Sequence, residues 1–221
     1  HYDYDRTLKA LERCIKWRIE KRPYAVQKSQ VMRELRTQKA YWYGRDRQGH
    51  PICVMKPQYH LPSQRDYDEC LKFTYYTIEY GIKLMMMTET ENGNGGGNGS
   101  DNSSSSYCTD GKCVIIYDGS SVGFSNLELA MFKDVIECVQ MYPERLLKCF
   151  VVKPNWSFSA LLTTVTPFLD PVTKSKIVTI KDYGDLFQFI DPSQVQKEYG
   201  GTSDYNLLEA IEAEAATTSS L

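Results

Sequence analysis

The sequence predicts an α/β domain in which a largely parallel or mixed sheet is flanked by helices. Three apolar, strand-like runs at 113–117, 147–152 and 176–180 alternate with two amphipathic helical segments at 126–141 and 156–168. Strands separated by helices are joined by crossovers, so this order favours parallel pairing. The chain has 221 residues, of which 42% are hydrophobic. This is enough apolar sequence to bury the core of one such domain.

Helices and one β-hairpin are predicted before the first of these strands. Residues 5–20 place Leu8, Leu11, Ile15 and Ile19 at helical spacing, and Pro23 ends that helix. The other predicted elements are a second short helix at 26–35, a hairpin built from 41–43 and 51–55 around a turn at 46–49, and a long apolar helix at 67–87.

A stretch rich in Gly, Asn and Ser interrupts this pattern at 88–106. It contains NGNGGGNGS followed by a run of serines. Such a composition cannot bury apolar surface, and it predicts a disordered insertion between a helix and a strand of the same domain.

Charge and cysteine usage exclude several classes of protein. The net charge of -2 and the lack of a polybasic run argue against nucleic-acid binding and constitutive anchoring on anionic membranes. No segment reaches the roughly 18 to 20 apolar residues of a membrane-spanning helix. The 7 cysteines form no CxxC pair, so we expect free thiols and no metal site. Because the chain starts at His1 without a signal peptide, we interpret it as a fragment of a longer cytoplasmic protein.

One motif suggests a serine hydrolase. The letters GSSVG at 119–123 fit G-x-S-x-G, with Ser121 in the position of the nucleophile. That mechanism requires a histidine base after the serine. The three histidines, His1, His50 and His60, all precede Ser121. We therefore expect a small turn at this place, and no catalytic residue.

A series of motifs in the second half of the chain carries a more specific signal. They are YPERLL at 142–147, KPNW at 153–156, PFLDPVTKSKI at 167–177 and KEYGG at 197–201. Together with DRQGHP at 46–51, where His50 replaces an Arg, the series resembles the CRAL-TRIO domain family. Within it, the match is to the phosphatidylinositol/phosphatidylcholine transfer proteins.

The resemblance implies a small helical lobe and an α/β lobe whose sheet forms the floor of a lipid pocket. It assigns 1–25 to the end of the helical lobe, 26–205 to the lipid-binding domain and 206–221 to a C-terminal tail. A mobile gate helix would span 157–168. Its apolar stripe consists of Phe158, Leu161, Leu162, Val165 and Phe168. Taken without the resemblance, such a stripe is more often ordinary core packing.

The resemblance also assigns the lipid headgroup to Glu144, Thr173 and Lys176. Lys offers a point charge for phosphate, Thr a hydroxyl donor, and Glu an acceptor for sugar hydroxyls. A purely structural alternative is a Glu144–Lys176 salt bridge beside a capping turn. Where the family's choline-lipid site has Ser and Thr on the central strand, this chain has Cys113 and Ile115. That departure argues against phosphatidylcholine.

These observations predict a non-enzymatic domain that holds one amphipathic phospholipid, with phosphatidylinositol as the expected ligand. It would serve intermembrane transfer or lipid sensing and would meet a membrane surface transiently. No cofactor other than the bound lipid is expected. Two alternatives stay open. One is a carrier of a retinoid- or tocopherol-type molecule. The other is a lipid-regulated interaction module of a multidomain signalling protein.

Overall fold

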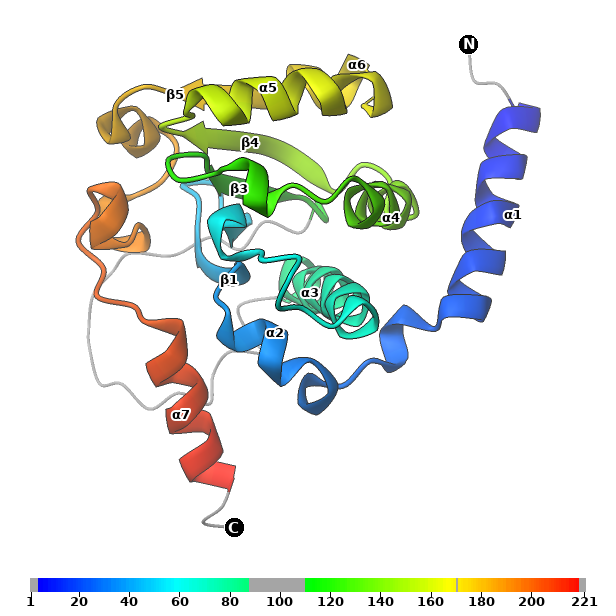
Figure 1. Ribbon diagram of the computed structural model, residues 1–221, viewed down its shortest axis with the longest axis horizontal. Coiled ribbons are helices and arrows are strands. Elements are labelled where there is room, and N and C mark those ends of the chain that lie inside the picture. Colours follow the sequence, from blue (N-terminus) through cyan, green and yellow to red (C-terminus); the bar gives the residue numbers. More distant parts are fainter. Residues whose placement is uncertain (1–3, 88–109, 170, 219–221) are drawn as a thin grey trace.

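The computed structural model of the chain describes residues 4–87, 110–169 and 171–218 (Figure 1). The whole insertion predicted at 88–106 lies outside these residues. The described part is a mixed sheet with helices packed around it, as the sequence predicts.

The sheet contains five strands in the order β1-β2-β3-β4-β5. They are β1 (Ala40–Arg45), β2 (Pro51–Met55), β3 (Cys113–Asp118), β4 (Leu146–Val152) and β5 (Ile177–Ile180). β1 and β2 form the expected antiparallel hairpin, while β2 to β5 pair in parallel. The apolar runs of the sequence are therefore the parallel strands, and the hairpin adds the antiparallel edge.

The helices agree with most of the predicted segments, but the helix predicted at 26–35 is a 3-10 turn (Lys28–Val31) followed by a short α-helix, and the predicted C-terminal tail contains a helix. The helices are α1 (Tyr4–Lys21), α2 (Met32–Arg36), α3 (Tyr67–Met86), α4 (Leu129–Gln140), α5 (Trp156–Val165), α6 (Pro171–Ser175) and α7 (Leu207–Thr218). The start expected for α4 at residue 126 is wrong. Residues Phe124–Asn126 form a 3-10 turn, in which the Asn126 Oδ1 atom accepts a hydrogen bond from Gly123 N at 2.8 Å. The amide of Asn126 thus holds a local turn that competes with the helix.

Strand register divides the sheet into two faces. Neighbouring residues of a strand point to opposite sides, and partners in register share a side. The first face, here called the closed face, carries Ile52, Val54, Val114, Ile116, Phe150, Val152 and Ile180. Each of these side chains is at most 3% exposed. The opposite face, here called the open face, carries Cys53, Ile115, Tyr117, Cys149 and Ile177.

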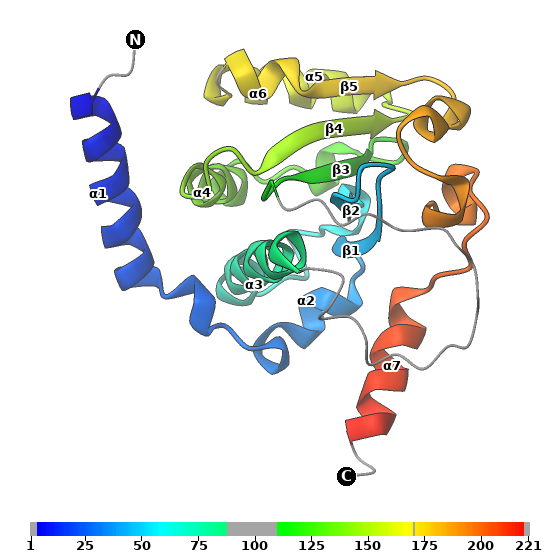
Figure 2. The same ribbon diagram turned by 180° about the vertical axis from the view of Figure 1, so that it is seen from behind.

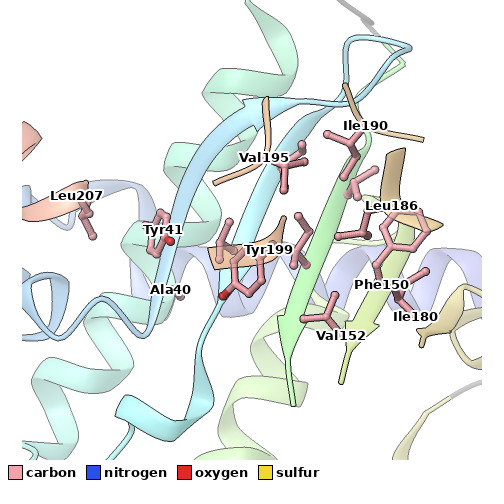
Figure 3. Close-up of a cluster of buried hydrophobic side chains, with 14 of the residues drawn as sticks. Ala40, Tyr41, Phe150, Val152, Ile180, Leu186, Ile190, Val195, Tyr199 and Leu207 are labelled. Carbon is pink, nitrogen blue, oxygen red and sulfur yellow. The ribbon is translucent and has the colours of Figure 1, made fainter. Parts of the chain in front are cut away.

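The closed face is covered by the segment 183–205, here called the C-terminal segment. Its Leu186, Ile190, Val195 and Tyr199 side chains are no more than 1% exposed, and they lie in one cluster with the strands (Figure 3). The residues predicted to form a C-terminal tail include α7, whose Leu207 and Ile211 are buried in the same cluster.

Helices cover the open face only in part. α3 packs on β1, where the indole nitrogen of Trp42 donates to Thr77 O at 2.8 Å. α5 packs on β3, where the rings of Phe158 and Tyr117 lie 5.3 Å apart. Between these contacts, Ile115, Cys149 and Ile177 remain only partly buried. The middle of the open face therefore retains accessible apolar surface.

α1 lies beside α3 and α4, away from α7 (Figures 1 and 2). Its Trp17 is buried between Tyr75 of α3 and Tyr142, with ring centroids 5.5 and 5.9 Å away. The opposite side of α1 exposes Tyr4, Leu8, Leu11, Ile15 and Ile19. None of the described helices is both long and apolar enough to cross a membrane.

Candidate functional site

Three cysteines contribute to the open face and its edges. Cys53 and Cys113 are buried, and Cys149 is partly buried. Burial raises the pKa of both Cys113 and Cys149 to about 12. Thiols with such pKa values stay protonated at neutral pH and behave as small apolar groups. The six cysteines that the structure describes are free thiols, as expected.

The structure brings together two of the three residues assigned to the headgroup. Glu144 precedes β4, and Lys176 precedes β5. Their Oε2 and Nζ atoms lie 3.4 Å apart although 32 residues separate them in the chain. Thr173 lies one turn earlier in α6, and its carbonyl accepts a hydrogen bond from Lys176 N at 3.1 Å. The three residues therefore lie just before the N-terminal ends of two neighbouring strands, β4 and β5.

The Glu144 side chain is open to solvent and its backbone is unusual. It is 78% exposed, whereas the Lys176 side chain is 20% exposed. The φ angle of Glu144 is 59°, which lies in the left-handed region that only a few per cent of non-glycine residues adopt. Such conformations carry a cost of order 1 to 3 kcal/mol and concentrate at binding and catalytic sites.

α5 is held in place at its first turn. The side chain of Asn155 caps the helix by accepting a hydrogen bond from Phe158 N at 2.9 Å, and its Nδ2 donates to Val122 O at 2.7 Å. Of the predicted apolar stripe, Phe158 is buried and Leu162 is partly buried. The side chains of Leu161, Val165 and Phe168 lie outside the described ones.

The G-x-S-x-G segment forms a turn at the end of β3. The backbone N and the Oγ of Ser120 donate to Asp118 Oδ1 at 3.0 and 2.6 Å, while Ser121 is exposed. The nearest histidine in the sequence, His60, directs its Nε2 to Glu128 Oε2 at 3.2 Å. These contacts fit a tight turn stabilised by Asp118.

The KEYGG motif has a structural role that the sequence alone does not reveal. The Tyr199 hydroxyl donates to Asp118 Oδ2 at 3.1 Å, and Lys56 Nζ pairs with Glu198 Oε1 at 2.5 Å. Just before the motif, Gln196 Oε1 accepts a further hydrogen bond from the Tyr41 hydroxyl of β1 at 2.7 Å. The motif therefore ties the C-terminal segment to the ends of β2 and β3.

Curated relatives match this chain over most of its length. CRAL-TRIO domain-containing protein C3H8.02 of Schizosaccharomyces pombe is 25% identical over 79% of this chain and 35% of its own length. Phosphatidylinositol transfer protein CSR1 of Eremothecium gossypii is 24% identical over 93% of this chain and 45% of its own length. Patellin-6 of Arabidopsis thaliana is 28% identical over 89% and 47%, respectively. The chain thus spans less than half the length of these relatives.

A solved structure and a family model agree with these relatives. The crystal structure of Sfh5 superposes with a TM-score of 0.66, at 18% identity, covering 94% of this chain and 72% of that one. This likeness establishes the fold. The model of the CRAL/TRIO domain matches residues 35–201, which is well over half of the chain. The motifs, the sheet and the family match lead to one conclusion, that the chain belongs to the CRAL/TRIO domain family.

Proposed function

We propose that this domain binds one amphipathic phospholipid, with phosphatidylinositol as the ligand, and that it transfers or senses this lipid at a membrane surface. The observation that carries the proposal is the 3.4 Å contact between Glu144 and Lys176, with Thr173 on the adjacent turn. These are the residues expected to bind an inositol phosphate. The name of the relative CSR1, a phosphatidylinositol transfer protein, supports the same ligand.

The chemistry of the three residues suits an inositol phosphate. Lys176 supplies charge for the phosphate, Thr173 a hydroxyl, and Glu144 an acceptor for ring hydroxyls. A solvent-exposed ion pair contributes only about 0 to 1 kcal/mol to stability. The Glu144–Lys176 pair therefore contributes little to the fold, and both partners can bind a ligand without a large structural cost.

The open face of the sheet is the proposed floor for the acyl chains. Ile115, Cys149 and Ile177 present apolar surface that helices leave partly uncovered. Each methylene group exposed to water costs about 0.8 kcal/mol, so a diacyl lipid leaves a bilayer slowly. An apolar floor that receives the chains lowers this barrier.

α5 and the 3-10 turn Thr166–Phe168 that follows it are the proposed gate. The Asn155 cap anchors the first turn of α5, and Phe158 rests on Tyr117. Movement of the C-terminal end of α5 around this anchor would uncover the apolar floor.

The proposal includes a division of the chain into three parts. Residues 1–25 are the end of the helical lobe, residues 26–205 are the lipid-binding domain, and residues 206–221 are a C-terminal tail.

A nonpolar cargo, such as a retinoid or tocopherol, is the second candidate. The observation that favours it is the apolar character of the central strand at Cys113 and Ile115, neither of which offers a hydroxyl to a polar headgroup. Because burial raises the pKa of Cys113 and Cys149 to about 12, both thiols stay protonated and uncharged at neutral pH and suit an apolar ligand. A nonpolar ligand would use this floor without contacting Glu144 or Lys176.

Lipid transfer between liposomes tests the proposal. We expect Lys176→Ala and Glu144→Ala to weaken phosphatidylinositol binding by roughly one to two decades, the effect of losing one charge-assisted hydrogen bond. Lys174→Ala is the matched control, because Lys174 is exposed on the same short helix α6. It should transfer phosphatidylinositol like the wild type.

The choice of lipid separates the two candidates. Transfer of a retinoid should be equal in the wild type and in the three variants, since that ligand carries no inositol phosphate. Equal transfer of phosphatidylinositol by wild type and Lys176→Ala would reject the headgroup assignment in favour of a nonpolar cargo. Mass spectrometry of lipid that copurifies with the protein identifies the ligand independently.

A further inference from the structure

A lysine occupies an unexpected position on the closed face of the sheet. Lys148 of β4 lies in register with Val114 of β3 and two residues before Phe150. Both neighbours are at most 2% exposed, whereas Lys148 is half-buried. A charge that is partly removed from water needs a partner, because desolvation disfavours the charged form.

That partner is an aromatic ring. The ammonium of Lys148 lies 4.4 Å from the centroid of the Phe189 ring. Within the described ranges, no ion pair joins Lys148 to a carboxylate. A ring face satisfies only part of an ammonium, which has three N–H donors. Lys148 therefore keeps donors available for a further ligand.

A hollow adjoins this lysine. It has a volume of about 310 Å³, near the lower end of the range for small-molecule sites. Its apolar walls are Val114, Leu147, Phe150 and Phe189, and its polar rim consists of Asp46, Arg47, Gln48, Lys148 and Gln188. The partly exposed Phe189 ring presents the accessible aromatic surface beside the ammonium, and the buried Phe150 ring packs against it with the centroids 4.9 Å apart.

The other charged groups of the hollow already have partners. Arg47 Nη1 pairs with Asp191 Oδ2 at 3.3 Å, and its Nε donates to Phe187 O at 3.1 Å. The carboxylate of Asp46 accepts hydrogen bonds from Gln48 N, His50 N and His50 Nδ1, each at 2.9 Å. Of the two cations that line the hollow, Lys148 is thus the one without a carboxylate partner among the described residues.

We propose that this hollow binds a small organic anion, namely a carboxylate on a single aromatic ring. The carboxylate contacts Lys148 and the ring stacks in the apolar wall near Phe189. None of Glu144, Thr173 or Lys176 lines the hollow. Lys148 and Val114 also lie on the face opposite Tyr117 and Cys149, so this site is separate from the proposed lipid floor.

Titration with 3-phenylpropanoate, followed by NMR chemical shifts, tests the proposal. A ligand of this size should bind the wild type with a dissociation constant on the order of 1 mM. We expect the neutral 3-phenylpropanamide and the variant Lys148→Met each to weaken binding by roughly tenfold or more. Lys148→Arg should retain binding, because it keeps the charge. Shifts should concentrate at Leu147 and Phe189.

Two controls make the outcome decisive. Lys83→Met removes an exposed lysine of α3 and should bind like the wild type. Lys176→Ala should also bind like the wild type, since the proposed headgroup residues do not line the hollow. The proposal is overturned by equal affinity in wild type and Lys148→Met, by loss of binding in Lys176→Ala, or by shifts concentrated on Tyr117 and Cys149.

A thermal melt checks that Lys148→Met is folded. This variant should melt at or above the wild-type temperature, because it removes a partly desolvated charge.

Discussion

Glu34 of α2 and Lys39 form an ion pair in the interior, with side chains 2% and 9% exposed. The ammonium of Lys39 also donates to Cys70 Sγ at 3.0 Å and lies 5.4 Å from the centroid of the Phe73 ring. These three partners of the cation come from α2 and α3. The pair joins these helices to the start of β1.

We predict that Glu34→Leu destabilises the protein by about 3 to 5 kcal/mol, because it leaves a buried and unpaired cation. The double variant Glu34→Leu, Lys39→Leu should recover most of that loss. Asp204→Ala, which breaks the exposed pair with Lys197, serves as the comparison and should cost less than about 1 kcal/mol. Urea unfolding measures all three variants. Equal stability of the single and double variants would contradict the prediction.

A second residue-scale effect concerns pH. His60 and Arg65 both contact the carboxylate of Glu128, at 3.2 and 3.1 Å. The hydrogen bond from Arg65 holds the pKa of Glu128 below its usual 4.5. Burial, aided by the charge of Lys39, lowers the pKa of His60 below 6.5. Both groups stabilise the fold above their unfolded pKa values, and that contribution is lost as the pH falls through the folded values.

We therefore predict that the melting temperature declines as the pH falls below 6.5, because the unfolded chain then binds a proton that folded His60 resists. His60→Gln should remove this part of the decline. The further decline below pH 4.5, which comes from Glu128, should remain. Calorimetry of both proteins from pH 7 to pH 3.5 tests this, and superimposable profiles would exclude His60 as the cause.

At the scale of elements, α3 and α5 pack on different strands of the open face, α3 on β1 and α5 on β3. α5 depends on its Asn155 cap and on the Phe158–Tyr117 contact. α3 approaches β1 so closely that a Cβ atom at Gly81 would overlap the indole of Trp42. Glycine is thus required at this position by the distance between helix and strand.

We predict that Gly81→Ala lowers stability by roughly 1 to 3 kcal/mol, the usual cost of overpacking. Inside an ordinary exposed helix the same change would stabilise by about 1 kcal/mol, so the sign reports the packing. Gly184→Ala is the control, since its Cβ would meet only Asp182 Oδ1 at 3.4 Å. Thermal melts of both variants decide the question. A stabilised Gly81→Ala protein would show that α3 does not pack tightly on Trp42.

At the scale of the whole molecule, the two faces of the sheet differ in how completely they are covered. The C-terminal segment and α7 cover most of the closed face and leave the hollow beside Lys148, whereas α3 and α5 leave the middle of the open face accessible. This asymmetry supports the proposed lipid floor.

The insertion should contribute little to this architecture. We predict that shortening residues 90–106 to a few residues changes the melting temperature only slightly, because the composition buries nothing and a twofold change in loop length alters the closure free energy by only about 0.6 kcal/mol. Differential scanning fluorimetry of the shortened chain provides the measurement. A large fall would mean that the insertion packs against the domain.

The order and type of most elements were predictable because they depend on local pattern, whereas α7 lies in residues that were expected to form a tail. The apolar run of β3 predicts a buried strand, and the spacing of α1 predicts a helix. Motifs such as YPERLL and KEYGG predict the family because several of them occur in the right order. The beginning of α4 was not predictable, since Asn126 uses its side chain to form a turn that periodicity does not detect.

The candidate site depends on both the sequence and the tertiary structure. The family resemblance of the sequence motifs selected Glu144, Thr173 and Lys176, and the pattern of apolar residues determined that the core is a sheet with helices. Only the tertiary structure decided that Glu144 and Lys176 meet, that one face of the sheet stays open, and that Lys148 borders a hollow beside Phe189. The physical reason is distance along the chain. Local periodicity determines secondary structure, whereas burial and charge pairing depend on residues brought together by strand register and by the return of the C-terminal segment.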